Sequence, residues 1–253
     1  LVSNGVYSTG GLTNYPTCSS LSNRVVINKP ITVRSVNGAV VTTIEGRWSP
    51  LTQNGDWSVR CVYMANGASL IGFTLYMGST RYSSENYMGY GGGAWCQSTS
   101  AVISDCVFQY NAAAWYGAGA YNGTLSNCTL IGNVSDAYGG GASGGTLNNC
   151  TLDRNSAENG GGAYDCTLFD CTLTTNVATS GGGACRDCTL FNCRLSGNTA
   201  TNFGGGAYGG LLYNCSLTNN SSDAGGGTYD CTLYNCTLTS NSATSDGGGA
   251  YDS

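Results

Sequence analysis

A repeat of about 22 residues runs through most of this chain and limits the folds that it can adopt. Cysteine recurs at steps of 21 or 22 residues, at Cys106, Cys128, Cys150, Cys171, Cys193, Cys215 and Cys236. Asparagine follows five residues after each cysteine, at Asn111, Asn133, Asn155, Asn176, Asn198, Asn220 and Asn241. A Gly-Gly-Gly-Ala-Tyr phrase, with variants, keeps the same period from Gly91 to Gly247. A fixed period of this kind predicts a solenoid.

The length and composition of the repeat select β-structure. Helical repeats need about 33 residues or more, and Thr, Asn, Ser and Gly are poor helix formers. Leucine-rich repeats have a suitable length but need several more leucines per unit. The segment Cys171-Thr172-Leu173-Thr174 instead alternates with a period of two and is closed by Asn. We therefore expect an all-β, single-stranded parallel β-helix with about 22 residues and three short strands per coil, each strand pairing ~4.8 Å from its equivalent in the next coil.

The first 90 residues follow the same logic less regularly. Residues 68–78 align without gaps on residues 101–111, with Phe73 at the cysteine position, and no linker-like stretch divides the chain. We therefore expect one β-helical domain over residues 1–253. In this interpretation residues 1–90 form irregular early coils with insertions near 47–58 and 79–90, and residues 91–253 form regular coils of 21–23 residues.

Composition excludes several function classes. The 253 residues carry a net charge of −5 with nine Lys and Arg scattered singly, which argues against nucleic acid and anionic membranes as partners. The sequence has no His, so it lacks the commonest general acid–base residue and the commonest zinc ligand. No apolar run reaches ~18 residues, so we expect no membrane span. We also expect no cofactor.

The repeat phrases resemble a known group of proteins. GGGAYDCTLFDCTLTTNVA and GGGTYDCTLYNCTLTSNSA resemble repeats of right-handed parallel β-helix proteins with the pectate-lyase-like fold. They are most similar to the polymorphic outer-membrane-protein type of repeat in bacterial surface proteins, and NRVVINKPITVRSVNG is similar to early coils of such proteins. The resemblance implies a right-handed coil and an exported, bacterial-type protein that is extracellular or on the cell surface. It does not imply one activity, because this fold serves lyases, hydrolases, adhesins and stalks.

The cysteines form a predicted structural ladder. Stacked residues would lie ~4.8 Å apart at both Cα and Cβ, and a disulfide needs a Cβ separation of about 3.5–4.5 Å. A free thiol is a small hydrophobic group that suits a narrow interior, so we expect mostly free core thiols and no metal site. Intra-coil disulfides remain an alternative in an exported protein for the pairs Cys166–Cys171, Cys188–Cys193 and Cys231–Cys236.

The asparagine ladder has a structural interpretation as well. Asparagine tolerates left-handed corner angles and can bond its own backbone or the next Asn in a stack. We therefore expect the ladder to hold corners together rather than to bind a ligand.

Aromatic residues follow many of the glycine phrases. They are Trp95, Tyr121, Tyr164, Tyr208, Tyr229 and Tyr251, interrupted at Ser143 and Cys185. Strict alternation places Tyr164 on the same face as Cys166, which favours the core. A bend at Asp165 would reverse this direction, and an outward row could grip sugar rings or a neighbouring molecule.

Acidic residues cluster at two places only. Asp165 and Asp187 lie one coil apart, and so do Asp230 and Asp252. Paired carboxylates can serve a glycosidase or hold a cation. Gly and Asn occupy the same slot in other coils, however, and the sole lysine, Lys29, is far from these acids in the sequence. We interpret the acids as solvated corner residues and expect no catalytic, cofactor-binding or metal-binding residues.

The sequence thus predicts a non-enzymatic extracellular structural protein, which would be a β-helical stalk, an adhesin or a self-assembling filament module. The alternative is a carbohydrate-active enzyme or carbohydrate-binding domain on the same fold. The expected partner is a second copy of the chain stacked end to end, or flanking coils of a longer chain. Carbohydrate is a further partner under the alternative.

Overall fold

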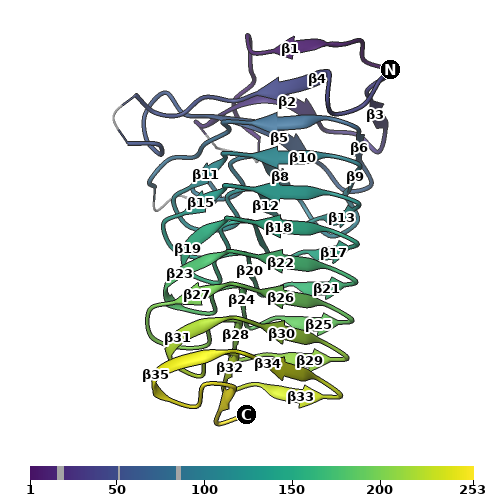
Figure 1. Cartoon of the computed structure of the whole chain (residues 1–253). Coiled ribbons are helices and arrows are strands. Elements are labelled where there is room, and N and C mark those ends of the chain that lie inside the picture. The colour runs from purple at the N-terminus through teal and green to yellow at the C-terminus, as the bar shows by residue number, and fades with distance from the viewer. Residues whose placement is uncertain (16–19, 51, 84–86) are drawn as a thin grey trace.

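The computed structural model describes residues 1–15, 20–50, 52–83 and 87–253, and these residues form strands and no helix. Four parallel sheets wind around one axis as a right-handed β-helix, with the N-terminal coils at one end and the C-terminal coils at the other (Figure 1). The predicted fold class is confirmed. None of the described residues belongs to a helix that could cross a membrane.

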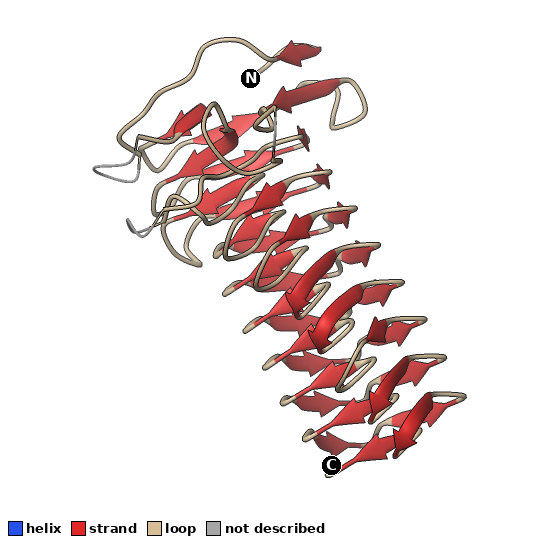
Figure 2. Cartoon of the chain, turned by 90° about the vertical axis from the view of Figure 1, so that its left-hand side faces the viewer, coloured by secondary structure: helices blue, strands red, loops and turns tan. Residues whose placement is uncertain are grey.

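Each regular coil visits sheets I to IV in turn, as seen from the side in Figure 2. Sheet I contains β2 (Ser22–Ile27), β5 (Val59–Met64), β8 (Ala94–Cys96), β12 (Ala120–Tyr121), β16 (Ala142–Ser143), β20 (Ala163–Tyr164), β24 (Cys185–Arg186), β28 (Ala207–Tyr208), β32 (Thr228–Tyr229) and β36 (Ala250–Tyr251). Sheet II contains β3 (Thr32–Arg34), β6 (Ser69–Ile71), β9 (Val102–Ser104), β13 (Thr124–Ser126), β17 (Thr146–Asn148), β21 (Thr167–Phe169), β25 (Thr189–Phe191), β29 (Leu211–Tyr213) and β33 (Thr232–Tyr234).

The other two sheets complete the coil. Sheet III contains β1 (Gly5–Tyr7), β4 (Thr42–Glu45), β7 (Thr74–Tyr76), β10 (Val107–Gln109), β14 (Thr129–Ile131), β18 (Thr151–Asp153), β22 (Thr172–Thr174), β26 (Arg194–Ser196), β30 (Ser216–Thr218) and β34 (Thr237–Thr239). Sheet IV contains β11 (Ala112–Ala113), β15 (Val134–Ser135), β19 (Ser156–Asn159), β23 (Val177–Gly181), β27 (Thr199–Ala200), β31 (Ser221–Ala224) and β35 (Ser242–Asp246).

A regular coil therefore holds four strands, and the expected number of three was wrong. The additional strand belongs to sheet IV and begins directly after the ladder asparagine. It is as short as two residues in β11 and β15, which is too short to produce a visible alternation in the sequence.

The four strands of a coil are separated by residues in the left-handed conformation. In one coil these are Gly160 (φ 63°), Asp165 (φ 50°), Asp170 (φ 53°) and Thr175 (φ 52°). Asn and Asp recur at such corners because they tolerate these angles better than other residues with a side chain. The ladder asparagines do not adopt the left-handed angles expected of them. The residue before each of the ladder asparagines does, and the asparagine that follows it points into the interior.

The glycine phrase is required by close approach of the next coil. A Cβ atom on Gly161 would lie 2.3 Å from the carbonyl oxygen of Val177, and one on Gly162 would lie 2.5 Å from that of Ala184. Both distances are below van der Waals contact, so a side chain would force the coils apart. The high glycine content thus follows from stacking.

Alternating leucines fill the interior. Leu168 of sheet II and Leu173 of sheet III are fully buried, whereas Thr172 is partly exposed. Leu173 is in register with Leu152 and Leu195 in the adjacent coils. The same inner column of sheet III contains Phe108, Leu130, Leu152, Leu173, Leu195, Leu217 and Leu238.

The early coils join the same sheets. Ser69 pairs with Val102 and Thr74 with Val107, which confirms the predicted alignment of residues 68–78 on 101–111. The segment near 47–58 connects β4 to β5, and the segment near 79–90 lies between β7 and β8. Within these two predicted insertions, residues 51 and 84–86 lie outside the described residues.

Candidate functional site

The ladder asparagines form a continuous hydrogen-bonded column inside the coil. In each step the Nδ2 atom of one asparagine donates to the Oδ1 atom of the next, at 2.9–3.0 Å, from Asn111 through to Asn241. The same Oδ1 atom also accepts the backbone N–H of the preceding asparagine. The column leaves no amide group of its inner members unpaired, so its chemistry is structural.

The ladder cysteines are also internal. Cys106, Cys128, Cys150, Cys171, Cys193 and Cys215 are buried, and Cys236 is partly buried. Each thiol donates to the backbone carbonyl two residues before it, as Cys171 does to Phe169 at 3.2 Å. Burial raises the pKa of Cys106 to about 12. The Cys106 thiol is therefore protonated and unreactive at neutral pH.

The structure excludes the intra-coil disulfides considered from the sequence. Cys166 and Cys171 lie at opposite ends of β21, so their Cα atoms are roughly 10 Å apart at ~3.3 Å per residue, beyond the reach of a disulfide. The same strand separation applies to Cys188–Cys193 and to Cys231–Cys236. All of these cysteines are free thiols, and Cys166 instead neighbours Cys188 one coil away, where the Cys188 sulfur accepts the Cys166 backbone N–H at 3.4 Å.

The aromatic row of sheet I faces outward, contrary to the expectation from alternation. Asp165 turns the chain through its left-handed conformation between Tyr164 and Cys166. Cys166 is buried as a result, whereas Tyr164 lies partly exposed on the outer surface. The same turn repeats at Asn122, before the buried Gly123, and at Asp230, before the buried Cys231.

A second aromatic column was missed in the sequence and lies beside the first. It contains the residue directly before the glycine phrase in several coils, which is the signal that could have revealed it: Tyr90, Tyr116, Tyr138 and Phe203. The two columns interlock, with ring centres 4.9 Å apart for Tyr90 and Tyr121 and 4.7 Å apart for Tyr138 and Tyr164. Together they form an outer surface along the axis that we call the aromatic strip.

Two residues interrupt the first column of the aromatic strip. Ser143 pairs in register with Tyr121 and Tyr164. The second interruption is Arg186 and not Cys185, because Arg186 pairs with Tyr164 and Tyr208 while the Cys185 side chain points inward. The difference arises because β23 pairs with β19 through an irregularity that adds one residue to the coil.

The interruption at Ser143 opens a groove of about 350 Å³ on the outer surface. Aromatic and polar groups line it together: Tyr90, Tyr116, Tyr121, Asn122, Ser143, Gly144, Tyr164 and Asp165. Exposed aromatic rings beside hydrogen-bonding groups can bind a planar or cationic group or a sugar ring.

The predicted acidic pairs occupy corners on the outer surface. Asp165, Asp187, Asp230 and Asp252 all have left-handed φ angles between 50° and 55°, and Asn122 in the same column has a left-handed φ of 57°. Burial raises the pKa of Asp187, and the Arg186 guanidinium lies 3.4 Å from its carboxylate. In the described residues no three His, Cys, Asp or Glu side chains gather into a group that could hold a metal ion. Corner geometry accounts for these acids.

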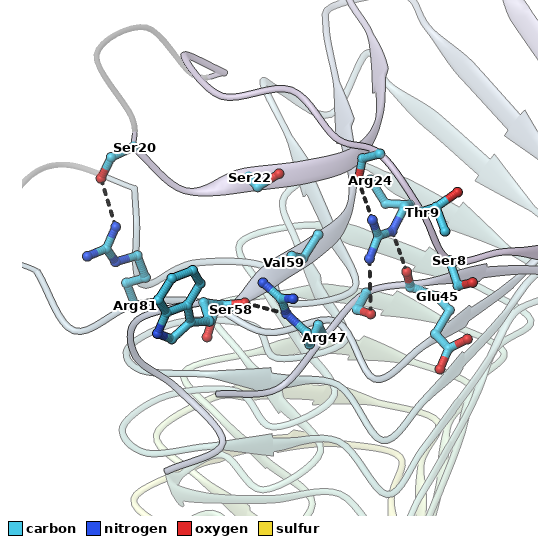
Figure 3. Close-up of a pocket in the computed structure, with 13 residues that line it drawn as sticks. Ser8, Thr9, Ser20, Ser22, Arg24, Glu45, Arg47, Ser58, Val59 and Arg81 are labelled. Carbon is cyan, nitrogen blue, oxygen red and sulfur yellow. Dashed lines mark hydrogen bonds between the residues drawn. The ribbon is translucent and has the colours of Figure 1, made fainter. Parts of the chain in front are cut away.

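A larger pocket of about 710 Å³ lies at the N-terminal end, and Arg24, Arg47 and Arg81 are among the residues that line it (Figure 3). Arg24 donates to the carbonyl oxygen of Glu45 at 2.7 Å, and Arg47 donates to that of Trp57 at 2.8 Å. Arg81 forms an ion pair with Asp56 and donates to Ser20 at 3.0 Å. Fixed guanidinium groups of this kind attract carboxylate, sulfate or phosphate groups.

The sequence interpretation missed this pocket because it treated the basic residues as evenly scattered. Six of the nine Lys and Arg fall within residues 1–81, which carry only two Asp and Glu, for a net charge of +4. Residues 82–253 carry three basic and twelve acidic residues, for a net charge of −9. This asymmetry was the available signal. Lys29 does not line the pocket.

Comparisons with known proteins add one structural similarity. No protein-family model matches the sequence, and no curated protein matches it. The crystal structure of pectate lyase Pel9A is similar with a TM-score of 0.47 and 13% sequence identity, over 98% of this chain and 71% of that chain.

Proposed function

We propose that this chain is a non-enzymatic structural solenoid of an exported, cell-surface protein. The observation that carries the proposal is the unbroken asparagine column, which ties seven successive coils into one body. Continuous pairing of this kind stiffens a rod along its axis, because each coil is held by its neighbours.

The acidic corners support a structural role. Asp165 and Asp187 occupy positions that Asn122, Gly144 and Gly209 fill in other coils, and all five residues have left-handed φ angles. A requirement of the turn therefore explains their presence without any reaction. Asp187 also faces Arg186 in an ion pair.

The more specific role that we propose, at the cell surface, rests on the repeat phrases of the sequence and on the outer surface of the structure. The similarity of the phrases to the polymorphic outer-membrane-protein type of repeat supports a stalk, an adhesin or a filament module on a bacterial surface. The exposed aromatic strip supports adhesion in particular, since tyrosine-rich surfaces are favoured in protein interfaces. Contact with a second copy or with flanking coils belongs to the same proposal.

A turnover screen tests the proposal. Purified protein is incubated with pectin, alginate and chondroitin-type polymers, with and without calcium, and the products are measured by mass spectrometry. We expect no cleavage. Cleavage that is abolished by Asp187→Ala but retained in Asp170→Ala, a matched change at another left-handed corner, would overturn the structural proposal.

A carbohydrate-binding domain is the second candidate, and the arginine pocket is the observation that favours it. Three guanidinium groups around a hydroxyl-rich cavity suit acidic sugars. The test is a glycan array with the native protein and with Arg47→Gln. Selective binding of acidic glycans that this substitution removes would support the candidate, and an array without signal would exclude it.

A further inference from the structure

Two positions in the first column of the aromatic strip hold no aromatic residue, and only one of them carries a long side chain. Arg186 lies between Tyr164 and Tyr208, and Ser143 lies between Tyr121 and Tyr164. At both positions the flanking tyrosines are therefore two coils apart, which leaves a gap of roughly 9–10 Å between their Cα atoms at ~4.8 Å per coil. The two gaps can be compared directly within one molecule.

The guanidinium group of Arg186 fills the first gap. Its central carbon lies 4.6 Å from the centre of the Tyr208 ring. Its Nε atom lies 3.4 Å from the carboxylate of the following residue, Asp187, and its Nη1 atom donates to Oδ1 of Asn159. The aromatic strip thus accepts a planar cation between its rings, held by a ring face and by a carboxylate at the corner.

Among the described residues, no long side chain from the Ser143 coil fills the second gap, and the ring of Tyr116 forms its wall, 6.4 Å from the ring centre of Tyr121 and 6.2 Å from that of Tyr164. Ser143 is short and almost fully buried, at 2% exposure, and the next residue, Gly144, has no side chain. Tyr121 and Tyr164 border the groove in the coils on either side, while Tyr90 and Tyr116 lie along its edge. The space of about 350 Å³ is larger than a guanidinium group and open to solvent.

The charges at this groove favour a cation. Asp165 is the charged residue among those that line it. The surrounding residues 82–253 carry a net charge of −9, and the faces of tyrosine rings are electron-rich. An anionic group would be repelled, whereas a cation would gain both a ring contact and a carboxylate partner.

We propose that this groove binds the guanidinium group of an arginine presented by a partner protein. The incoming arginine would lie beside Ser143, at the position that Arg186 occupies two coils further along. Gly144 is the position equivalent to Asp187, and Asp165, the corner residue of the next coil, would supply the carboxylate. A planar guanidinium fits between two rings and pairs with a carboxylate through two parallel N–H groups, which a tetrahedral ammonium does not. This inference stands whether or not the chain has an enzymatic activity.

The direct test is calorimetric titration with the blocked tripeptide Gly-Arg-Gly. Its control is the same peptide with citrulline, which is a neutral analogue of similar shape. We expect the arginine peptide to bind at least tenfold more tightly, with an affinity that falls as salt is added. Equal binding of the two peptides, no binding of the arginine peptide, or preferential binding of methyl glucoside would each overturn the proposal.

Two variants locate the site. Ser143→Arg combined with Gly144→Asp recreates the Arg186–Asp187 pair in the empty gap, so we expect the affinity for the arginine peptide to fall at least tenfold. Asp165→Asn keeps a residue that tolerates the left-handed corner and removes only the charge, so we expect a several-fold loss.

A matched control separates filling the groove from altering the surface in general. Asn148→Tyr also extends an aromatic row, because Asn148 is in register with Phe169 on the outer face of sheet II. We expect this variant to bind the peptide like the native protein. Native-like binding of the peptide by a folded Ser143→Arg/Gly144→Asp variant would overturn the proposal. If that double variant does not fold, an unchanged affinity in Asp165→Asn would overturn the proposal instead.

Discussion

The side-chain amide of Asn155 donates to Oδ1 of Asn176 at 3.0 Å, and the same oxygen accepts the backbone N–H of Asn155, also at 3.0 Å. The side-chain oxygen of each ladder asparagine from Asn133 onward thus accepts two hydrogen bonds from the ladder asparagine of the preceding coil, one from its backbone N–H and one from its side-chain amide. Asn155 completes its own set by donating to the carbonyl oxygen of Leu130 at 2.9 Å. A fully paired polar column can therefore lie in an interior that is otherwise apolar.

Replacing Asn176 by Leu should destabilise the protein strongly. The change leaves both the backbone N–H and the Nδ2 atom of Asn155 without their shared acceptor, and each buried unpaired group costs about 1–3 kcal/mol. We expect a loss of about 3 kcal/mol in the free energy of unfolding, measured in urea. The partly exposed Asn148→Leu is the control, and an equal loss in both variants would contradict the role of the column.

A charged residue in the leucine column should destabilise the protein, whereas a charged residue on the outer face of the same strand should have little effect on stability. Leu173→Asp places a carboxylate in a fully buried position, at a cost of several kcal/mol. Thr172→Asp places the same group on the outer surface of the same strand and should cost less than about 1 kcal/mol. Thermal unfolding measures both variants, and similar losses in melting temperature would mean that the assignment of inner and outer faces is wrong.

The buried thiols should resist alkylation until the chain unfolds. Burial raises the pKa of Cys61, Cys96 and Cys106 to about 12, so at pH 8 each is protonated as well as inaccessible. Iodoacetamide at pH 8 should therefore modify these three residues in urea and leave them unmodified in buffer. Mass spectrometry measures the difference, and rapid modification in buffer would contradict the burial of these three thiols.

Even the conservative replacement of Arg60 by lysine should destabilise the protein. It is fully buried and donates to the carbonyl oxygens of Tyr90 at 2.7 Å and Gly91 at 2.8 Å, and to Oδ1 of Asn23 at 2.8 Å. Lysine carries one compact ammonium group and cannot span these acceptors. We expect Arg60→Lys to cost about 3 kcal/mol in urea unfolding because two or more charged hydrogen bonds are lost.

The exposed Arg34→Lys is the matched control for Arg60→Lys, and it should leave stability unchanged. A similar small effect for both would contradict the role of Arg60 as a link between the early coils and the aromatic strip.

The sequence predicted the interior better than the outer surface. The positions of Cys171, Leu173 and Asn176 follow from period and alternation, because stacking repeats the same environment in every coil. The direction of Tyr164 did not follow, because the left-handed turn at Asp165 breaks the alternation and Asp is compatible with either conformation. The strands of sheet IV were too short to leave a pattern.

The arginine pocket escaped prediction for a different reason. Arg24, Arg47 and Arg81 come from segments that share no period, and only the winding of the early coils places them around one pocket. The position of Arg186 was displaced by the additional residue in β23, which sequence spacing alone does not locate. Non-repeating features of a repeat protein thus depend on tertiary placement.

The orientation of Tyr164 relative to Cys166 tests the account most directly, because the interior columns and the outer aromatic strip both depend on the turn between them. Hydroxyl-radical footprinting with mass spectrometry measures both residues within a single short peptide. We predict rapid oxidation of the partly exposed Tyr164 and protection of Cys166, which is only 3% exposed. Protection of Tyr164 together with rapid oxidation of Cys166 would contradict the account.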